Sequence, residues 1–160
     1  MENEILSLEK EIIDNGVVCF TPKGNSMRPF IKGGKHTVLV SKKEGKLRTF
    51  DVALYKNKDG KYILHRIVEV LEDGYTFTGD FITEKEFISE DDVFGYATGY
   101  FTDKKHKKFI DASSPKRLKK VAKYYKSEKK RLRYIKRKSC FLSFGGKIKC
   151  VFTKKEKGNV

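Results

Sequence analysis

Six short apolar segments, each closed by a turn signal, constrain the fold of this chain more than any other feature. They span residues 17–22, 36–42, 49–57, 62–71, 75–80 and 92–102, and several alternate between apolar and polar side chains. Sequences such as KKEGK, KDGK and EDG separate them, which is typical of tight turns between antiparallel strands. We therefore predict a mostly β fold, built on a coiled, barrel-like antiparallel sheet.

One helix is predicted ahead of the sheet, over residues 2–15. Ile5, Leu8 and Ile12 recur at helical spacing, and Gly16 follows as a C-terminal stop. The segment is acidic and amphipathic, so it lacks the positive start and apolar centre of a signal peptide. No apolar run approaches the roughly 20 residues that span a bilayer. We therefore expect a cytoplasmic protein.

The charges divide the chain into two parts near Asp103. Residues 1–102 carry 14 Lys and Arg against 17 Asp and Glu, whereas residues 103–160 carry 22 against 4. The net charge of +15 therefore comes from the second part. We predict a folded domain over residues 1–102, with its leading helix at 1–16, and a basic helical tail over 103–160. This excess of positive charge indicates an anionic partner: lipid, nucleic acid or an acidic protein surface.

The basic tail contains a helix-start signal at Ser114 and Pro115. An incomplete apolar stripe follows, made of Leu118, Val121, Tyr125, Leu132 and Ile135. A helix of this kind can lie on the anionic inner face of a membrane. It can equally be a solvated charged helix or a disordered tail. The sequence leaves both interpretations open and favours nucleic acid less than a membrane.

The three cysteines, Cys19, Cys140 and Cys150, are widely spaced. An odd number in this arrangement argues against a disulfide framework, and no CxxC spacing indicates zinc. A bridge between Cys140 and Cys150 has no support in the sequence. We expect free thiols in a reducing compartment, no metal and no cofactor.

A serine and a histidine are the candidates for chemistry. A serine hydroxyl is a poor nucleophile unless a base takes its proton, and Ser26 lies in the turn GNSMRPF before a predicted strand. His36 follows that serine too closely, and His106 lies in a solvated basic run. His65 lies inside the predicted strand YILHRIVEV, and an ordinary histidine pKa of about 6.5 suits a general base. A lone strand histidine is more often structural, so these residues alone leave both roles open.

Four segments, in this order and spacing, resemble the type I signal peptidase family. GNSMRPFI resembles the family's box around its nucleophile, and FDVALYKNKDGKYILHRIVEV resembles the strand pair that carries the base. TGD and the later FGYATG resemble the Gly-Asp box and the closing strand. The match covers most of residues 17–100. It implies the signal-peptidase fold, shared with LexA-like self-cleaving repressors, and a serine endopeptidase that cleaves a leader or signal-type peptide bound as an extended strand.

The resemblance also implies roles for individual residues. Ser26 would be the nucleophile, and His65 would be the general base and then the acid, as in the histidine-base branch of the family. Asp80, in the Gly-Asp box, would either orient the imidazole of His65 or pair with Arg66 and brace the two strands. The sequence leaves both roles of Asp80 open.

The chain departs from the family pattern at four points, and one of them, Gly34-Lys35 where Gly-Asp is usual, is expected to affect only a turn. Gly24 stands where many members have a hydroxyl residue that binds the oxyanion, so Asn25 is the candidate replacement. The histidine branch has a second carboxylate after the Gly-Asp box, and only Glu84 or Glu86 could supply it. Signal peptidases carry transmembrane anchors, and no such apolar segment occurs here.

Two other functions remain open for this sequence. One is a non-catalytic module that keeps the fold and binds leader peptides, which Gly24 and the missing apolar anchor favour. The other is a repressor-like regulator that cleaves itself and associates with DNA through the basic tail. Residues 1–16 are too short for a helix-turn-helix, and the repressors of the superfamily use lysine as their base.

Overall fold

The computed structural model describes residues 2–103 and 105–143, and within them the strands form one antiparallel sheet. The strand order is β1-β2-β7-β3-β4-β5-β6, and β8 pairs with β7. In chain order the elements are α1 (Glu2–Asn15), β1 (Val17–Phe20), β2 (Thr37–Lys42), β3 (Val52–Lys56), β4 (Tyr62–Val70), β5 (Gly74–Thr78), β6 (Glu86–Ser89), the 3-10 helix η1 (Glu90–Asp92), β7 (Val93–Phe101), β8 (Phe109–Asp111), α2 (Pro115–Lys126) and α3 (Glu128–Ser143).

The predicted coiled antiparallel sheet is confirmed, and so are the leading helix and the helical tail. The sheet does not close into a barrel, because no pairing joins β1 to β6 in the described residues. All six expected strands are present, and the sequence reading missed β6 and β8. Residues 86–89 read EFIS without clean alternation, and β8 is only three residues long. Such short strands depend on a paired neighbour more than on their own pattern.

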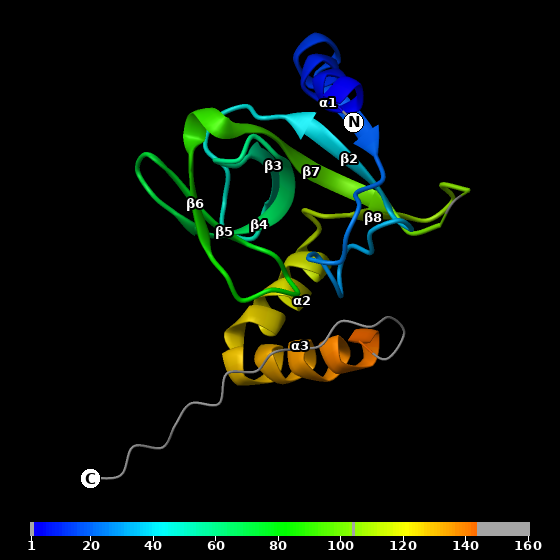
Figure 1. The fold of residues 1–160 in the computed structure, drawn as a ribbon, viewed down its shortest axis with the longest axis vertical. Helices are drawn as coiled ribbons and strands as arrows, with labels where there is room; N and C mark the ends of the chain where they lie inside the picture. Colours follow the sequence, from blue (N-terminus) through cyan, green and yellow to red (C-terminus); the bar gives the residue numbers. More distant parts are fainter. Residues whose placement is uncertain (1, 104, 144–160) are drawn as a thin grey trace.

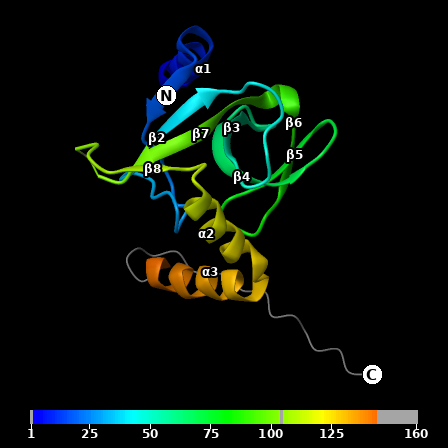
Figure 2. The same cartoon turned by 180° about the vertical axis from the view of Figure 1, so that it is seen from behind.

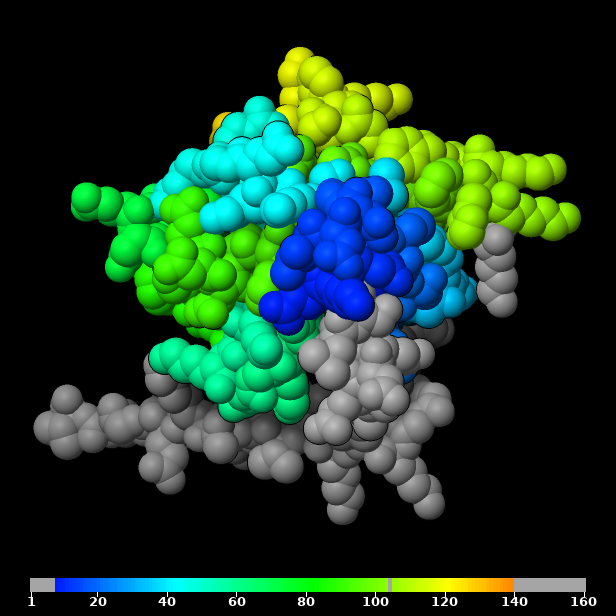
Figure 3. Space-filling model, turned by 90° about the horizontal axis from the view of Figure 1, so that it is seen from above, coloured from blue at the N-terminus to red at the C-terminus, as the bar shows by residue number. Residues whose placement is uncertain are grey.

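Helices lie at opposite ends of the sheet, with α1 at one end and α2 and α3 at the other (Figures 1 and 2). Gly16 ends α1 with a φ of +72°, a conformation that glycine adopts without steric cost. In the space-filling view onto this end, α1 (dark blue) lies on the surface with residues of the cyan β2 region beside it (Figure 3). The two ends of the sheet are therefore covered by different parts of the chain.

Two apolar clusters form the core. The first lies among α1, β1, β2, β3 and β7 and includes the fully buried Val38 and Val40. The second lies within the coil of β3 to β7 and includes Tyr55, Ile67 and Phe77, all fully buried. The rings of Tyr55 and Phe77 lie 4.4 Å apart between centroids. Together the clusters fix β3 and β4, the strand pair from which the candidate site is built.

The two C-terminal helices pack against the sheet domain. Val121 on α2 is only 1% exposed, and the ring of Tyr124 meets Phe30 edge-on at 5.3 Å. The guanidinium of Arg117 lies 4.6 Å from the centroid of the same phenylalanine ring. Much of the apolar side of the tail therefore faces the body. Cys150, the side chain of Cys140 and residues 144–160 lie outside the described part of the structure.

Candidate active site

The segment that carries Ser26 is a compact turn held by its own backbone and by buried anchors. The N–H of Arg28 donates to the carbonyl of Asn25 at 3.1 Å, and the N–H of Ile31 donates to that of Met27 at 2.9 Å. Met27 and Ile31 are 5% and 2% exposed. Ser26 itself is only half-buried. The apolar residues on either side thus anchor the turn in the core while the serine hydroxyl stays accessible.

The structure brings Ser26 and His65 together. Oγ of Ser26 lies 3.0 Å from Nε2 of His65, within hydrogen-bond reach. His65 lies on β4, where it pairs with Ala53 of β3. The two residues are 39 positions apart in the chain, so the sheet and not local sequence sets their geometry. This arrangement is what a serine nucleophile and its general base require.

The second ring nitrogen of His65 contacts Tyr55, a residue that the sequence reading did not single out. Nδ1 lies 3.2 Å from the hydroxyl of Tyr55, which in turn donates to Oε2 of Glu86 at 2.9 Å. Because the hydroxyl of Tyr55 donates its only hydrogen to Glu86, it can only accept a hydrogen bond from the imidazole, so Nδ1 carries the proton. Nε2 is then unprotonated and can accept the proton of Ser26. The contact therefore selects the tautomer that a general base needs.

Burial keeps His65 uncharged near neutral pH. Loss of solvation lowers the pKa of His65 to about 4, and the negative charge of Asp80 opposes that shift in part. The neutral imidazole is the form that takes a proton from a hydroxyl. Burial and the hydrogen bond to Glu86 also raise the pKa of Tyr55 well above its ordinary value. Tyr55 thus remains a phenol and keeps its place between the base and the carboxylate.

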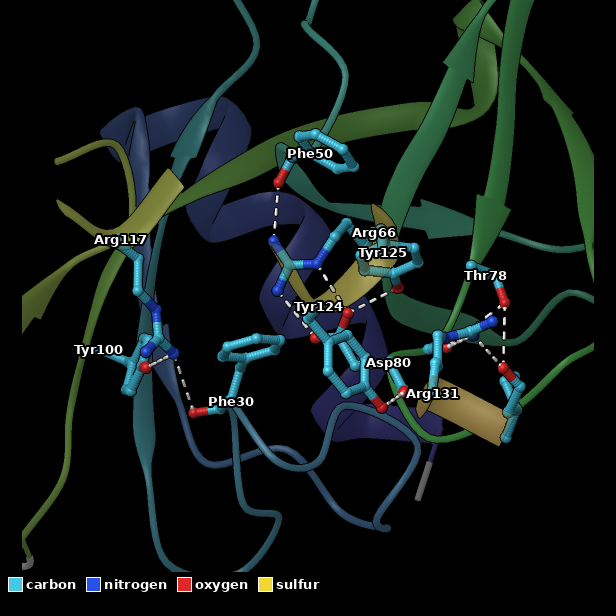
Figure 4. A network of polar contacts seen from close by, with 12 residues as sticks. Phe30, Phe50, Arg66, Thr78, Asp80, Tyr100, Arg117, Tyr124, Tyr125 and Arg131 are labelled. Carbon is cyan, nitrogen blue, oxygen red and sulfur yellow. Dashed lines mark hydrogen bonds and ion pairs between the residues drawn. The ribbon is translucent and has the colours of Figure 1, made fainter. Parts of the chain in front are cut away.

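Asp80 pairs with Arg66 and does not contact the imidazole of His65. Nε and Nη2 of Arg66 donate to the two carboxylate oxygens at 2.7 and 2.8 Å, a bidentate pair (Figure 4). Nη1 of the same arginine donates to the carbonyl of Phe50 at 2.7 Å. Asp80 is fully buried and Arg66 is 5% exposed. Of the two roles that the sequence left open, the structure shows the bracing pair.

Of the two glutamates that could supply the second carboxylate, only Glu86 is connected to the site. Glu86 reaches the site through Tyr55. Glu84 is exposed, and its carboxylate accepts from the N–H of Thr83. A sequence signal for Glu86 did exist, because the family resemblance called for a carboxylate after the Gly-Asp box.

The expected side-chain donor for an oxyanion is not in place. Asn25 is exposed, and its backbone carbonyl caps the turn. The backbone N–H of Ser26 donates to no acceptor in the described residues and faces no competing partner. Gly24 has a φ of +89°, which a serine or threonine rarely adopts, and a Cβ on Gly33 would lie 1.8 Å from the Gly24 carbonyl oxygen. The positive φ thus accounts for glycine at position 24, where a Cβ would meet no other atom, and the packing against the Gly24 carbonyl accounts for glycine at position 33.

A groove of about 920 Å³ runs past Ser26 and His65. Its walls come from α1, β1, the Ser26 segment, β3 and the first half of β4, and their apolar side chains include Leu8, Phe20, Met27, Ile31, Leu54 and Leu64. On β4, residues 62–65 pair with β3 on one side, while pairing with β5 begins at Arg66. An edge of β4 beside the candidate base is therefore open to pairing among the described strands. Apolar walls and a free strand edge suit an extended peptide.

No group of three or more His, Cys, Asp or Glu side chains is placed to hold a metal ion in the residues that the structure describes. Nor is any helix in residues 2–103 and 105–143 both long and apolar enough to cross a membrane.

No protein-family model, curated protein or solved structure matches the chain in the three comparisons made. The candidate site is therefore assigned a function from its geometry and its chemistry.

Proposed function

We propose that this protein is a serine endopeptidase of the signal-peptidase type, with Ser26 as nucleophile and His65 as general base. The observation that carries the proposal is the 3.0 Å approach of Ser26 Oγ to Nε2 of His65, beside an apolar groove. Two further features support it: the hydrogen bond that selects the tautomer of His65, and the lowered pKa that keeps its ring neutral.

The reaction then follows from the positions of these atoms. Nε2 of His65 takes the proton of Ser26 as Oγ bonds to the substrate carbonyl carbon, and the carbonyl oxygen becomes an oxyanion. The backbone N–H of Ser26 stabilises that charge. The imidazolium then gives its proton to the leaving amine as the peptide bond breaks. Water, deprotonated by the same histidine, hydrolyses the acyl-enzyme and restores both residues.

The groove supports the substrate class that the family resemblance implies. A leader or signal-type peptide, bound as an extended strand, would pair with the open edge at residues 62–65 and place apolar side chains against Leu54 and Leu64. A single donor for the oxyanion predicts a slow enzyme, because one lost donor costs about a hundredfold or more in rate.

A fluorophosphonate probe, which phosphonylates activated serines with loss of fluoride, tests the proposal. We expect labelling of the wild type at Ser26, no labelling of Ser26→Ala, and strong loss in His65→Gln. Ser113→Ala, a change at an exposed serine outside the groove, is the matched control and should label normally. A folded wild-type protein that is not labelled at Ser26, yet binds leader-type peptides, would favour the non-catalytic binding module instead.

We also propose that the protein associates peripherally with an anionic membrane surface at its cytoplasmic face, by charge and not by insertion. The apolar side of α2 is turned toward the body, with Val121 buried, whereas Lys119, Lys120 and Lys123 are exposed. Exposed basic side chains attract anionic lipid headgroups by roughly 1 kcal/mol each. The free face of α2 therefore suits adsorption.

Co-sedimentation with vesicles tests this second proposal in the full chain. We expect binding to vesicles that contain phosphatidylglycerol, little binding to neutral phosphatidylcholine vesicles, and loss of binding above roughly 0.5 M salt because exposed charges are then screened. Reversing the charge of Lys119, Lys120 and Lys123 to glutamate should weaken binding. Reversal of Lys56, Lys58 and Lys61, which lie at the β3–β4 turn, is the control. Equal binding of both triple variants would count against α2 as the docking surface.

A further inference from the structure

The backbone of Ser26 rests against the loop that follows β5. The N–H of Phe81 donates to the carbonyl of Ser26 at 2.7 Å. A Cβ on Gly79 would lie 2.7 Å from the same carbonyl oxygen, so only glycine allows this approach without a shift. The loop of residues 79–82, which we call the support loop, therefore sets where the nucleophile segment lies.

Side chains from α2 and α3 hold the support loop from its other side (Figure 4). The hydroxyl of Tyr125 donates to Oδ1 of Asp80 at 2.7 Å, and that of Tyr124 donates to the carbonyl of Asp80 at 2.7 Å. Nη2 of Arg131 donates to the carbonyls of Gly79, at 3.0 Å, and Ile82. Three side chains from α2 and α3 thus donate hydrogen bonds to three of the four residues of the support loop.

These contacts are buried, so the polar groups that form them have lost their contacts with water. Arg131 is 8% exposed, and its Nε has no hydrogen-bond partner in the described residues. Tyr125 donates to a carboxylate that already has a bidentate arginine partner. Asp80 lies in the support loop, after the end of β5, and Arg66 already ties it to β4. The added donors restrain the loop itself.

We propose that Tyr125 and Arg131 are positioning residues, which act through the support loop to hold Ser26 in register with His65. The proposal rests on the proposed function for its catalytic consequence. A reacting atom displaced by about 1 Å loses on the order of a hundredfold in rate. A more mobile support loop would therefore leave Ser26 and His65 present but misaligned with each other. On this proposal, α2 and α3 contribute to catalysis although they follow the last strand of the sheet in the chain.

Amide hydrogen exchange tests the physical link without requiring any activity. The variants are Tyr125→Phe, Arg131→Met and the conservative Arg131→Lys, with Tyr134→Phe as the matched control. The ring of Tyr134 also lies on the support loop, edge-on to Phe81 at 6.1 Å, but its hydroxyl makes no hydrogen bond among the described residues. The amide of Phe81 is the reporter, and that of Lys42, which donates to Gly16 at the far end of the sheet, is the internal reference.

We expect exchange at Phe81 to rise about tenfold in Tyr125→Phe and more in Arg131→Met, because each loses a hydrogen bond to a buried partner. Arg131→Lys should recover part of the protection, while Tyr134→Phe and the amide of Lys42 should not change. The rate of fluorophosphonate labelling at Ser26 should fall by a similar factor in the same variants.

Each outcome decides one of the two proposals. Unchanged exchange at Phe81 in both Tyr125→Phe and Arg131→Met would overturn the link between the helices and the support loop. Faster exchange with wild-type labelling would show that the loop moves without affecting Ser26, and would overturn the positioning role. Absence of labelling in the wild type would sink the proposed function, whereas the exchange result would still decide whether the helices hold the nucleophile segment.

Discussion

The hydroxyl of Tyr55 lies 3.2 Å from Nδ1 of His65 and places a phenol where a carboxylate would stand in a Ser-His-Asp triad. Glu86 is one hydrogen bond further away, at 2.9 Å from the same hydroxyl. The imidazole is therefore oriented by a neutral group that is itself fixed by a carboxylate.

Replacing Tyr55 by phenylalanine should slow labelling of Ser26 without unfolding the protein. The variant keeps the ring that packs on Phe77 and removes the hydroxyl that fixes the tautomer of His65. We expect a loss of about tenfold in rate, equivalent to one hydrogen bond of about 1.4 kcal/mol. Rates measured with the fluorophosphonate probe check this. Tyr96→Phe, at a half-buried tyrosine of β7, is the control, and an equal loss there would remove the special role of Tyr55.

The pH profile of labelling should be flat to unusually low pH. The reactive form of His65 is neutral, and its pKa is lowered to about 4. The rate should therefore hold from pH 8 to about pH 5 and halve near pH 4, whereas an unperturbed histidine would halve the rate near pH 6.5. The measurement is the second-order labelling rate at each pH, corrected for unfolding. A midpoint near pH 6.5 would mean that the imidazole is more solvated than the structure shows.

The same lowered pKa makes stability depend on pH. The unfolded chain binds a proton at His65 below about pH 6.5, whereas the folded protein does so only below about pH 4. Folding stability from this group is thus complete above pH 6.5 and is lost as the pH falls toward 4. The loss is on the order of 3 kcal/mol. Urea unfolding at pH 7 and pH 4.5 should show a smaller loss for His65→Gln than for the wild type.

Breaking the buried ion pair should cost far more stability than a surface pair. Arg66→Met leaves the carboxylate of Asp80 buried and short of its main partner, and we expect a loss of about 3–5 kcal/mol in the free energy of unfolding. Adding Asp80→Asn removes the uncompensated charge and should recover part of that loss. Chemical denaturation of both variants measures the difference. Arg48→Met, which removes an exposed arginine 3.9 Å from a carboxylate oxygen of Asp51, should change stability by less than about 1 kcal/mol.

Alkylation of Cys19 should block access to the groove. The thiol is exposed and belongs to the groove wall on β1. A bulky maleimide there would obstruct an extended peptide more than it obstructs the small fluorophosphonate. We expect cleavage of a leader-type peptide to fall severalfold after treatment while labelling of Ser26 persists. Cys19→Ala should resist the treatment, and inhibition of that variant would point to a different thiol.

Much of the sheet could be predicted because its strands carry their own signals. The turns KKEGK, KDGK and EDG divide the chain correctly, and the apolar pattern of residues 62–70 marks the strand that holds His65. The meeting of Ser26 and His65 came from the order of four motifs, since periodicity alone says nothing about a contact across 39 residues. The role of Asp80 stayed open because His65 and Arg66 are adjacent in the sequence, and the sequence does not show which of their side chains the carboxylate contacts.

What escaped prediction depends on tertiary contacts. Tyr55 reads as an ordinary strand aromatic, and only the position of β6 brings Glu86 to its hydroxyl. The incomplete apolar stripe and the many Lys and Arg of the tail predict a membrane-bound helix, a solvated helix or a disordered tail, and nothing in the sequence singles out Arg131. Its guanidinium is instead buried against the carbonyl of Gly79, and no local pattern distinguishes it from its exposed neighbours.

The hydrogen bonds from Arg131 to the support loop also affect the order in which the site is assembled during synthesis. A nascent chain that has emerged only as far as β7 already contains Ser26, His65 and the ion pair of Arg66 and Asp80. It lacks the donors to Gly79 and Asp80 that come from α2 and α3. The segment that supports the backbone of Ser26 therefore leaves the ribosome after both Ser26 and His65, and a product truncated before α2 would carry the dyad without the contacts from Tyr125 and Arg131.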